Sequence, residues 1–366
     1  MKKTLQNTSP QEDLLPPTKH DPVRNLFGVF LLILLLLSIV IFFQSEKKGQ
    51  AGTLLSMKGR SVSPTPFPFQ EMTIPYLRER KYTSILGAQQ AISNNGSYTS
   101  YLTSYASDGL NIQALLTKPN GEEPQGGWPA IVLVHGYIPP TQYVTTERYS
   151  DHVDYLARNG FVVLKIDLRG HGDSEGQPGG GYFGSDYVID TLNAYAALQS
   201  TDFVNPEKIG LWGHSMAGNI LMRSLAARPT IPAIVIWAGA VYSYEDQRKY
   251  GINDQSYRPP QTATPQQSRR VELFQKYGSP SAQSVFWQQV APTNYLDDIR
   301  GAIQIDHAAN DAVVNIGYSR DLMELLDKTS VPHELYEYPT GGHNIEGASF
   351  NLAMQRTVDF FKAYLK

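Results

Sequence analysis

The stretch KIGLWGHSMAGNILMRSL, residues 208–225, decides the fold. It starts as a short apolar strand, passes through a Gly-His-Ser-Met-Ala-Gly turn and continues as a helix. Small residues at positions 213, 217 and 218 leave room for a sharp turn, which lifts the hydroxyl of Ser215 clear of the strand end. The alternative interpretation is a serine that only caps an ordinary helix. We take Ser215 as a candidate nucleophile, and a serine nucleophile needs a base.

Apolar runs that alternate with helical segments surround this stretch. The runs predict strands at 98–105, 111–118, 129–136, 161–170, 209–215, 233–239, 302–308 and 333–338, and the segments predict helices at 146–158, 184–199, 216–228, 316–328 and 350–364. A hairpin followed by alternating strands and helices is the order of a mostly parallel central sheet flanked by helices. We therefore predict the α/β-hydrolase fold.

One interval does not fit this alternation, because residues 241–299 separate two consecutive strands. We interpret it as a helical cap inserted over the carboxyl ends of the strands, where ligands bind in open α/β sheets. Four of its aromatic residues are expected to line an apolar substrate pocket: Tyr242, Tyr244, Phe286 and Trp287. The alternative is that such rings only pack the cap against the body of the domain.

The base and its orienting acid follow the serine along the chain in this fold, each in a loop after a strand. His343 lies in the glycine-flanked loop after the last strand, which makes it the candidate base. Two acids compete for the third place. Asp306 lies inside a strand, whereas Asp311 lies in the following loop and is free to turn toward an imidazole. We predict a triad of Ser215, Asp311 and His343.

Acyl transfer also needs hydrogen-bond donors for the developing oxyanion. The N–H of Met216, directly after the serine, is one candidate. The second is expected from the loop after strand 129–136, where Tyr137 offers its N–H and its phenol hydroxyl. This chemistry requires neither a metal nor an organic cofactor.

The composition of the chain restricts the classes of partner and cofactor that we expect. The 366 residues include 31 Lys and Arg against 34 Asp and Glu, a net charge of -3, with no basic cluster, so a nucleic acid partner is not expected. The absence of cysteine excludes a disulfide framework, a thiolate nucleophile and a cysteine-bound metal. The sequence carries no indication of oligomeric state.

The N-terminal part predicts a membrane anchor. Residues 26–43, LFGVFLLILLLLSIVIFF, are uncharged and, at about 1.5 Å per residue, long enough to cross a bilayer core as one helix. Residues 1–25 are expected to be a disordered tail, and the Pro/Ser-rich residues 44–70 a stalk before a catalytic domain at 71–366. Basic residues flank the span equally. Because a Ser/Thr/Pro stalk is typical of exported anchored enzymes, we expect a single-pass protein with its catalytic domain outside the cytoplasm.

Residues 129–366 resemble the catalytic domain of the prolyl oligopeptidase family and of the related dienelactone-hydrolase-like enzymes. The resemblance rests on an ordered set of motifs: HGY at 135–137, DLRGHGDSEG at 167–176, GHSMAG at 213–218, D-x-x-V at 311–314 and GGHN at 341–344. Two positions depart from the family pattern, with Ala217 in place of glycine and HAAND in place of His-Gly-x-x-Asp. The resemblance implies hydrolysis of a peptide or an ester through an acyl-serine intermediate.

Three functional hypotheses follow from these residues. The first is a membrane-anchored serine peptidase for short peptides, the second is a carboxylesterase or acyl hydrolase with the same site, and the third is a catalytically silent binding protein. Residues 44–97 are too short for the substrate-filtering β-propeller of full-length prolyl oligopeptidases, so the cap is expected to gate access. The polar segment 167–176 is interpreted as structural, with Arg169 and Asp167 bracing neighbouring turns.

Overall fold

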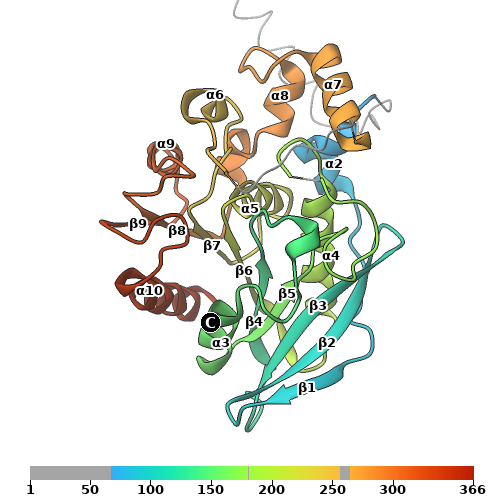
Figure 1. The fold of residues 1–366 in the computed structure, drawn as a ribbon, viewed down its shortest axis with the longest axis vertical. Helices are drawn as coiled ribbons and strands as arrows, with labels where there is room; N and C mark the ends of the chain where they lie inside the picture. Colours follow the sequence, from blue (N-terminus) through green and yellow to red (C-terminus); the bar gives the residue numbers. More distant parts are fainter. Residues whose placement is uncertain (1–66, 180, 256–263) are drawn as a thin grey trace, which may run out of the picture. The chain divides into compact units, whose positions relative to one another are not determined.

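A single sheet organises the chain. In the computed structural model, which describes residues 67–179, 181–255 and 264–366, nine strands pair in the order β1-β2-β3-β5-β4-β6-β7-β8-β9 (Figure 1). Their bounds are β1 Gln90–Asn94, β2 Tyr98–Ser107, β3 Leu110–Pro119, β4 Trp128–Val134, β5 Val162–Ile166, β6 Val204–His214, β7 Ala233–Trp237, β8 Ala302–Ala308 and β9 His333–Tyr338. The strands from β4 to β9 run parallel, and β1 to β3 form antiparallel pairs at one edge.

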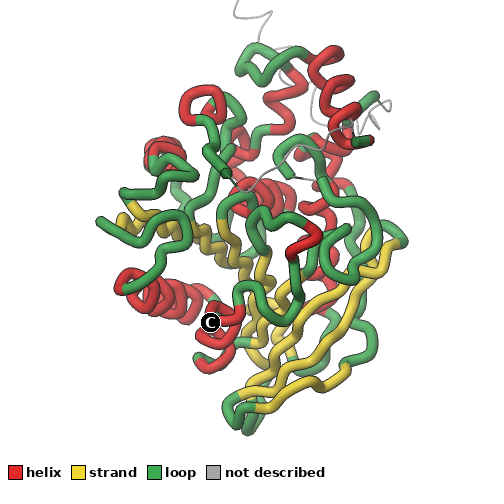
Figure 2. The backbone as a smooth tube through the Cα atoms, viewed as in Figure 1, coloured by secondary structure: helices red, strands yellow, loops and turns green. Residues whose placement is uncertain are grey.

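Helices cover both faces of the sheet, as Figure 2 shows in red around the yellow strands. They are α3 Ser150–Arg158, α4 Asp186–Gln199, α5 Ala217–Ala227, α9 Gly317–Leu326 and α10 Ala348–Tyr364. Residues of α3 and α10 share one core cluster, whereas residues of α4, α5 and α9 belong to the other. The sheet therefore lies between two apolar layers, as expected for parallel strands with crossover helices.

The central strand β4 contributes side chains to both apolar layers. Val132 and Val134 belong to the core on one face, and Ile131 and Leu133 belong to the core on the other. All four side chains are fully buried. A strand buried on both faces needs a continuous apolar run, because successive side chains point to opposite sides. This is why IVLV reads without polar alternation.

The predicted fold class is confirmed as an α/β-hydrolase fold with a mostly parallel sheet flanked by helices, and all eight predicted strands are present. The exposed edge strand β1 was not predicted, nor was the short helix α2, Ile74–Glu79, which follows a 3-10 turn, η1, at Gln70–Met72. The described unit begins at Phe67.

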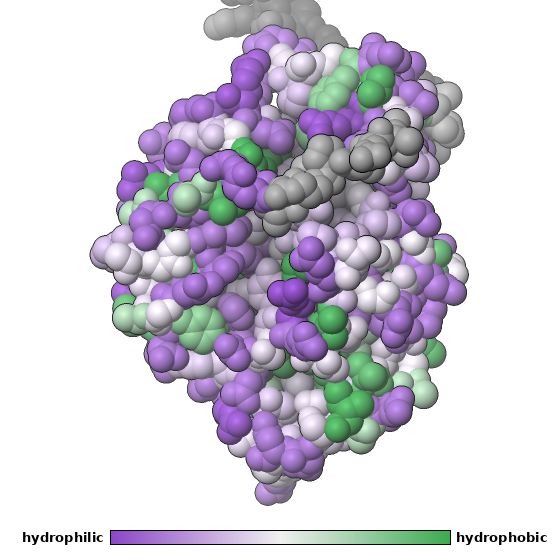
Figure 3. All heavy atoms as spheres, in the orientation of Figure 1, coloured by the Kyte–Doolittle hydropathy of each residue, from purple (hydrophilic) through white to green (hydrophobic). Residues whose placement is uncertain are grey.

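The predicted tail 1–25, the predicted membrane span 26–43 and nearly all of the predicted stalk lie outside the described residues. Within the part of the chain that the structure describes, no helix is both long and apolar enough to cross a membrane. The face seen in Figure 3 is largely hydrophilic, with scattered hydrophobic residues.

The described parts of the predicted cap, 241–255 and 264–299, are helical. They contain α6 Asp246–Tyr250, α7 Pro265–Tyr277, α8 Val285–Val290 and the 3-10 segment η3 Pro292–Asp298. The helix α7 begins with a capping box, in which Thr264 accepts from the N–H of Gln267 and the Gln267 side chain accepts from the N–H of Thr264. In Figure 1, α6, α7 and α8 lie together at the upper end of the view.

Aromatic contacts hold this segment to the loop that follows β5. The ring of Phe183 lies 5.3 Å from that of Phe274 and 6.4 Å from that of Trp287, measured between centroids. Because this loop leaves the carboxyl end of β5, the helical segment is attached on the carboxyl side of the sheet. Whether it roofs the active site remains a prediction.

The four aromatic residues expected to line a pocket are buried. Tyr242, Tyr244, Phe286 and Trp287 have exposed fractions of 1%, 2%, 6% and 2%. The ring of Phe286 stacks on Tyr277 with centroids 3.9 Å apart, and Tyr244 lies 5.6 Å from Trp287. In these contacts the rings pack against each other and the core. Their part in lining a substrate pocket stays a prediction.

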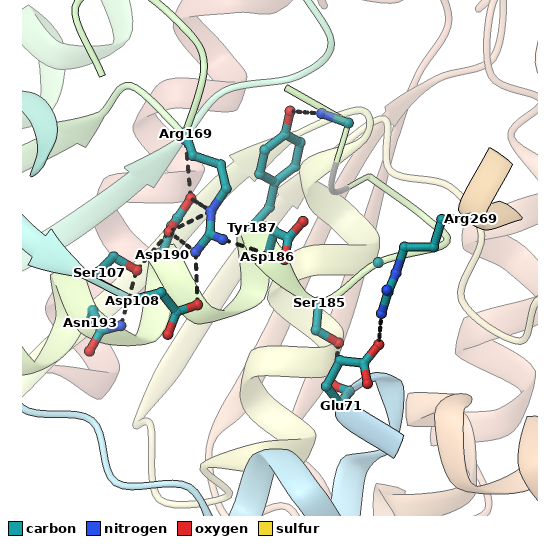
Figure 4. A network of polar contacts seen from close by, with 12 residues as sticks. Glu71, Ser107, Asp108, Arg169, Ser185, Asp186, Tyr187, Asp190, Asn193 and Arg269 are labelled. Carbon is teal, nitrogen blue, oxygen red and sulfur yellow. Dashed lines mark hydrogen bonds and ion pairs between the residues drawn. The ribbon is translucent and has the colours of Figure 1, made fainter. Parts of the chain in front are cut away.

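The segment 167–176 has the bracing role predicted for it (Figure 4). The guanidinium of Arg169 pairs with Asp190 at 2.7 Å, Asp108 at 3.2 Å and Asp186 at 3.4 Å. The Asp190 carboxylate is fully buried and also accepts a hydrogen bond from Ser107 at 2.7 Å. One arginine therefore ties the loop after β5 to the β2–β3 turn and to the start of α4.

Candidate active site

The turn between β6 and α5 holds Ser215 in a strained conformation. Its φ is 57°, in the left-handed region that non-glycine residues rarely adopt. Its N–H donates to the carbonyl of Trp237 at 2.8 Å, which fixes the turn to the neighbouring strand. Strain of this kind persists where the surrounding structure imposes it, and a nucleophile elbow is one such place.

Glycines make this turn possible. A Cβ added to Gly213 would lie 2.8 Å from the Cβ of Ala217, and one added to Gly218 would lie 2.7 Å from the Cα of Gly239. Both distances are too short for carbon atoms. The side chain of Ala217 is fully buried, so the structure accommodates alanine at the position where the elbow pattern has glycine.

The three predicted triad residues form one hydrogen-bonded chain. The Oγ of Ser215 lies 2.9 Å from Nε2 of His343, and Nδ1 of His343 lies 2.8 Å from Oδ2 of Asp311. A carboxylate can only accept, so Nδ1 of His343 carries the proton and Nε2 is left to accept from the serine hydroxyl. This is the tautomer that a general base for Ser215 requires.

Two neighbouring loops are joined behind the triad. His343 comes from the loop after β9, and Asp311 comes from the loop after β8. The side-chain oxygen of Asn310 accepts the N–H of Gly342 at 2.9 Å, which ties the two loops together one residue before each functional side chain.

The carboxylate of Asp311 is strongly stabilised as an anion. Burial opposes its ionisation, but hydrogen bonds from His307 and His343 outweigh burial and hold the pKa of Asp311 below its ordinary value. Its second oxygen, Oδ1, accepts the N–H groups of Val313 at 2.8 Å and Val314 at 3.0 Å. Asp311 is thus a fixed, charged acceptor at neutral pH.

The competing acid, Asp306, has a different environment. It is fully buried inside β8, and its carboxyl group accepts hydrogen bonds from Tyr338 and Gln304, both at 2.6 Å. Burial raises the pKa of Asp306 to about 7. Asp306 therefore makes its contacts inside the sheet, whereas Asp311 contacts the imidazole of His343.

The loop after β4 packs directly against the nucleophile. A Cβ added to Gly136 would lie 3.1 Å from the Cβ of Ser215. The two predicted oxyanion donors, Tyr137 and Met216, directly follow Gly136 and Ser215 in the sequence. Their N–H groups are thus carried by the two segments that meet at the serine, which is the arrangement an oxyanion hole requires.

Sequence reasoning missed three residues next to this site. His307 contacts Asp311, and His214 and Tyr149 connect to the main chain of His343. A signal was available only for His307, which begins the HAAND segment that ends at Asp311. Tyr149 and His214 are 65 positions apart, and His214 and His343 are 129 positions apart. Contacts over such separations cannot be predicted from local sequence.

Two surface depressions of the described residues lie away from the triad, and neither they nor a metal-binding group compete with it. Within residues 67–179, 181–255 and 264–366, no group of three or more His, Cys, Asp or Glu side chains is arranged to hold a metal ion. Two surface depressions, one beside Gly127 and Thr201 and one beside Glu245 and Lys249, have no triad residue in their linings.

Comparison with known proteins agrees with this fold. Residues 128–261 match the family model described as serine aminopeptidase, S33. The chain is also similar to the polyketide transferase claH of Penicillium crustosum, with 31% identity over 146 residues that cover 40% of this chain and 46% of that protein. The chain therefore spans less than half the length of this curated relative.

Solved structures resemble a larger part of the chain. An acetyl xylan esterase from Paenibacillus sp. R4 has a TM-score of 0.56 and 18% identity, and the match covers 80% of this chain and 92% of the esterase. An acylaminoacyl peptidase has a TM-score of 0.55 and 18% identity, covering 74% of this chain and 42% of the peptidase. At this identity the likeness establishes the fold alone.

The fold and the site together define a class, the serine hydrolases of the α/β-hydrolase fold. Peptidases and esterases both belong to this class. The narrower resemblance to the prolyl oligopeptidase family remains a prediction.

Proposed function

We propose that this protein is a serine hydrolase that cleaves small acyl substrates through an acyl-enzyme at Ser215. Esters are the substrates that we propose first. The observation that carries the proposal is the hydrogen-bonded chain from Ser215 through His343 to Asp311, with distances of 2.9 and 2.8 Å. The site combines a serine on a strained elbow, an imidazole in the required tautomer and a buried anion. This combination catalyses acyl transfer.

The reaction follows from this geometry. The Oγ of Ser215 attacks the acyl carbon while Nε2 of His343 takes the hydroxyl proton, and the negative oxygen of the tetrahedral intermediate receives hydrogen bonds from the N–H groups of Met216 and Tyr137. His343 then gives its proton to the leaving group. A water molecule, deprotonated by the same imidazole, attacks the acyl-serine, and His343 returns the proton to Oγ of Ser215 as the acid is released. Asp311 stays charged and stabilises the imidazolium in both halves.

Two acidic residues of the helical cap bear on the choice of substrate. An enzyme that selects a free amino terminus needs a carboxylate for the ammonium group. Asp246 accepts the N–H groups of Tyr242 at 2.7 Å and Ser243 at 3.0 Å, and Glu245 accepts the N–H of Ala282 at 2.6 Å. These main-chain contacts support a role for both carboxylates in holding turns of the cap, and on this basis we propose uncharged acyl substrates before peptides with a free amine.

Cleavage of short peptides is the second candidate. It is supported by the match of residues 128–261 to the serine aminopeptidase model and by the likeness to an acylaminoacyl peptidase. Peptide and ester hydrolysis use the same triad, so the two candidates differ in the leaving group and in the groups that hold it.

A matched substrate panel separates the candidates. The full-length chain is given p-nitrophenyl acetate and butyrate, and alanine p-nitroanilide with either a free or an acetylated amino terminus. We expect faster turnover of the esters than of either anilide, and none by Ser215→Ala. Preference for an anilide would favour the peptidase. Failure to hydrolyse any of these and to react with a fluorophosphonate would overturn the proposed class.

We also propose that residues 26–43 anchor the protein in a membrane, with the catalytic domain outside the cytoplasm. The support is the sequence itself, eighteen uncharged residues followed by a Pro/Ser-rich segment. We expect the full chain to resist carbonate extraction from membranes, and a chain lacking residues 1–44 to be released. Release of the full chain by carbonate would contradict the anchor. External protease that leaves the domain intact in unbroken cells would contradict its orientation.

A further inference from the structure

A second hydrogen-bonded chain ends on the main chain of His343. The N–H of Gly136 lies 3.0 Å from the hydroxyl of Tyr149, that hydroxyl lies 2.7 Å from Nδ1 of His214, and Nε2 of His214 lies 2.9 Å from the carbonyl oxygen of His343. The chain connects the loop after β4, the residue preceding α3, the end of β6 and the loop after β9. None of these contacts belongs to the triad.

The direction of every hydrogen bond in this chain is fixed by its two ends. The carbonyl of His343 can only accept, so Nε2 of His214 carries a proton and donates it. In a neutral ring, Nδ1 of His214 then accepts, and the hydroxyl of Tyr149 is its donor. The hydroxyl oxygen of Tyr149 is thereby left to accept the N–H of Gly136. All four groups are satisfied in one arrangement.

The protonation states agree with this arrangement. His214 is 5% exposed, and burial together with the neighbouring imidazole of His343 holds the pKa of His214 well below its ordinary value, so its ring is neutral. Burial raises the pKa of Tyr149 above its ordinary value, so its hydroxyl keeps the proton. The rings of His214 and His343 lie 4.6 Å apart.

The local backbone is shaped around these contacts. Tyr149 has a φ of 59°, a conformation that a bulky residue adopts only when its surroundings impose it. Gly136 has no room for a side chain, because a Cβ there would lie 3.0 Å from the hydroxyl of Tyr149 and 3.1 Å from the Cβ of Ser215. The hydroxyl of Tyr149 therefore lies directly behind the peptide that precedes Tyr137.

We propose that Tyr149 and His214 are positioning residues for catalysis. They hold the peptide of Gly136, and with it the oxyanion donor at Tyr137, in a fixed relation to the backbone of His343. The inference rests on the proposed hydrolase function and deepens it, because it assigns the alignment of oxyanion hole and base to one pair of side chains. Neither residue touches the substrate.

The proposal is tested with Tyr149→Phe and with Tyr155→Phe as a matched control. The hydroxyl of Tyr155, within the helix α3 that Tyr149 precedes, donates to the exposed side chain of Gln355 at 3.2 Å. Active sites in the full-length chain are counted with a fluorophosphonate, and kcat is expressed per titrated site with p-nitrophenyl acetate. We expect Tyr149→Phe to lower kcat about tenfold, less than the loss of a direct oxyanion donor, and to leave KM within about twofold.

A second measurement separates positioning from stability. Phenylboronic acid forms a tetrahedral adduct with an active serine, so its inhibition constant reports the oxyanion geometry. We expect that constant to rise in parallel with the fall in kcat for Tyr149→Phe and not for Tyr155→Phe. His214→Gln provides an independent variant, and the effects of the two substitutions should be smaller in combination than their sum, because they interrupt one chain.

The outcomes are distinct. Unchanged kcat and boronic acid affinity per titrated site in Tyr149→Phe, even with a lowered melting temperature, would overturn the positioning role. Additive effects of Tyr149→Phe and His214→Gln would overturn their coupling. If the wild-type chain neither turns over the ester nor reacts with the fluorophosphonate, the failure lies in the proposed hydrolase function itself.

Discussion

The Nε2 of His307 lies 3.1 Å from Oδ2 of Asp311, the same oxygen that Nδ1 of His343 approaches at 2.8 Å. The side chains of His307 and Asp311 are both fully buried. On its other side, Nδ1 of His307 lies 2.7 Å from the hydroxyl of Ser319. Because Nε2 of His307 also faces the carbonyl of Val314 at 3.0 Å, this nitrogen is a donor, and in a neutral ring Ser319 donates to Nδ1.

This relationship predicts a graded loss of activity at position 307. A hydrogen bond to a charged group contributes about 1.5 to 3 kcal/mol, so His307→Phe should lower kcat per titrated active site by about tenfold or more. His307→Gln retains an N–H near the former Nε2 and should lose less. Steady-state kinetics of both variants measure the difference. Equal kcat in wild type and His307→Phe would show that Asp311 needs no second imidazole.

A pH dependence of stability is expected from Asp306. Its carboxyl group titrates near 3.8 in an unfolded chain, and burial raises its pKa to about 7 in the fold. Between these values the unfolded chain has already released the proton that the folded chain still holds. The free energy of unfolding should therefore fall as the pH rises from about 4 to about 7, by on the order of 4 kcal/mol from this group.

The measurement compares urea unfolding of the wild type and Asp306→Asn from pH 5 to pH 8. Asn carries no charge, so the difference between the two curves should change in favour of Asp306→Asn as the pH rises. Parallel curves would rule out a raised pKa.

The two aspartates should also differ in their effect on activity. Asp311→Asn is expected to reduce kcat by about 10⁴ through the wrong tautomer of His343. Asp306→Asn should leave kcat largely intact.

The elbow predicts an asymmetry between neighbouring small residues. In Gly218→Ala the new Cβ would meet the Cα of Gly239 at 2.7 Å, a backbone atom that cannot move aside. We expect a loss of about 1 to 3 kcal/mol in stability and slower reaction of Ser215 with a fluorophosphonate. Ala217→Gly is the control, since it removes a methyl group and restores the usual elbow pattern. Wild-type labelling rates in Gly218→Ala would contradict the close approach.

Arg169 predicts a loss of stability without a loss of chemistry. Removing its guanidinium leaves the fully buried carboxylate of Asp190 without its ion partner, which costs about 3 to 5 kcal/mol. Asp186, whose side chain is 48% exposed, is the matched control, and Asp186→Asn should change stability by less than about 1 kcal/mol. Chemical unfolding measures both. If Arg169→Met lowered kcat per titrated site while keeping stability, segment 167–176 would be part of the active site.

These cases show which parts of the structure were accessible from the sequence. The strands β4 and β7 were predictable because buried parallel strands are apolar runs, and the triad was predictable because its members follow β6, β8 and β9 in a fixed order. The edge strand β1, QAISN, has no apolar alternation, since all five residues are exposed and only pairing with β2 makes it a strand.

The remaining features differ in how much local sequence shows of them. The start of α2 carried a usable signal, because Thr73 caps the helix and Pro75 follows within its first turn. Aromatic content, by contrast, does not distinguish a pocket wall from a core, and Trp287 and Tyr244 belong to the core. The contact between Tyr149 and His214 arises only once β4, β6 and α3 are assembled.

The central claim is that Ser215 is the nucleophile of a triad with His343 and Asp311, and its most direct test is covalent labelling followed by peptide mapping. The full-length chain is treated with a fluorophosphonate and digested, and the masses of its peptides are measured by mass spectrometry. We predict one adduct per chain, on the peptide containing Ser215, its absence in Ser215→Ala, and a labelling rate reduced by orders of magnitude in His343→Ala. An adduct that persists in Ser215→Ala, or that maps to another serine, would contradict the claim.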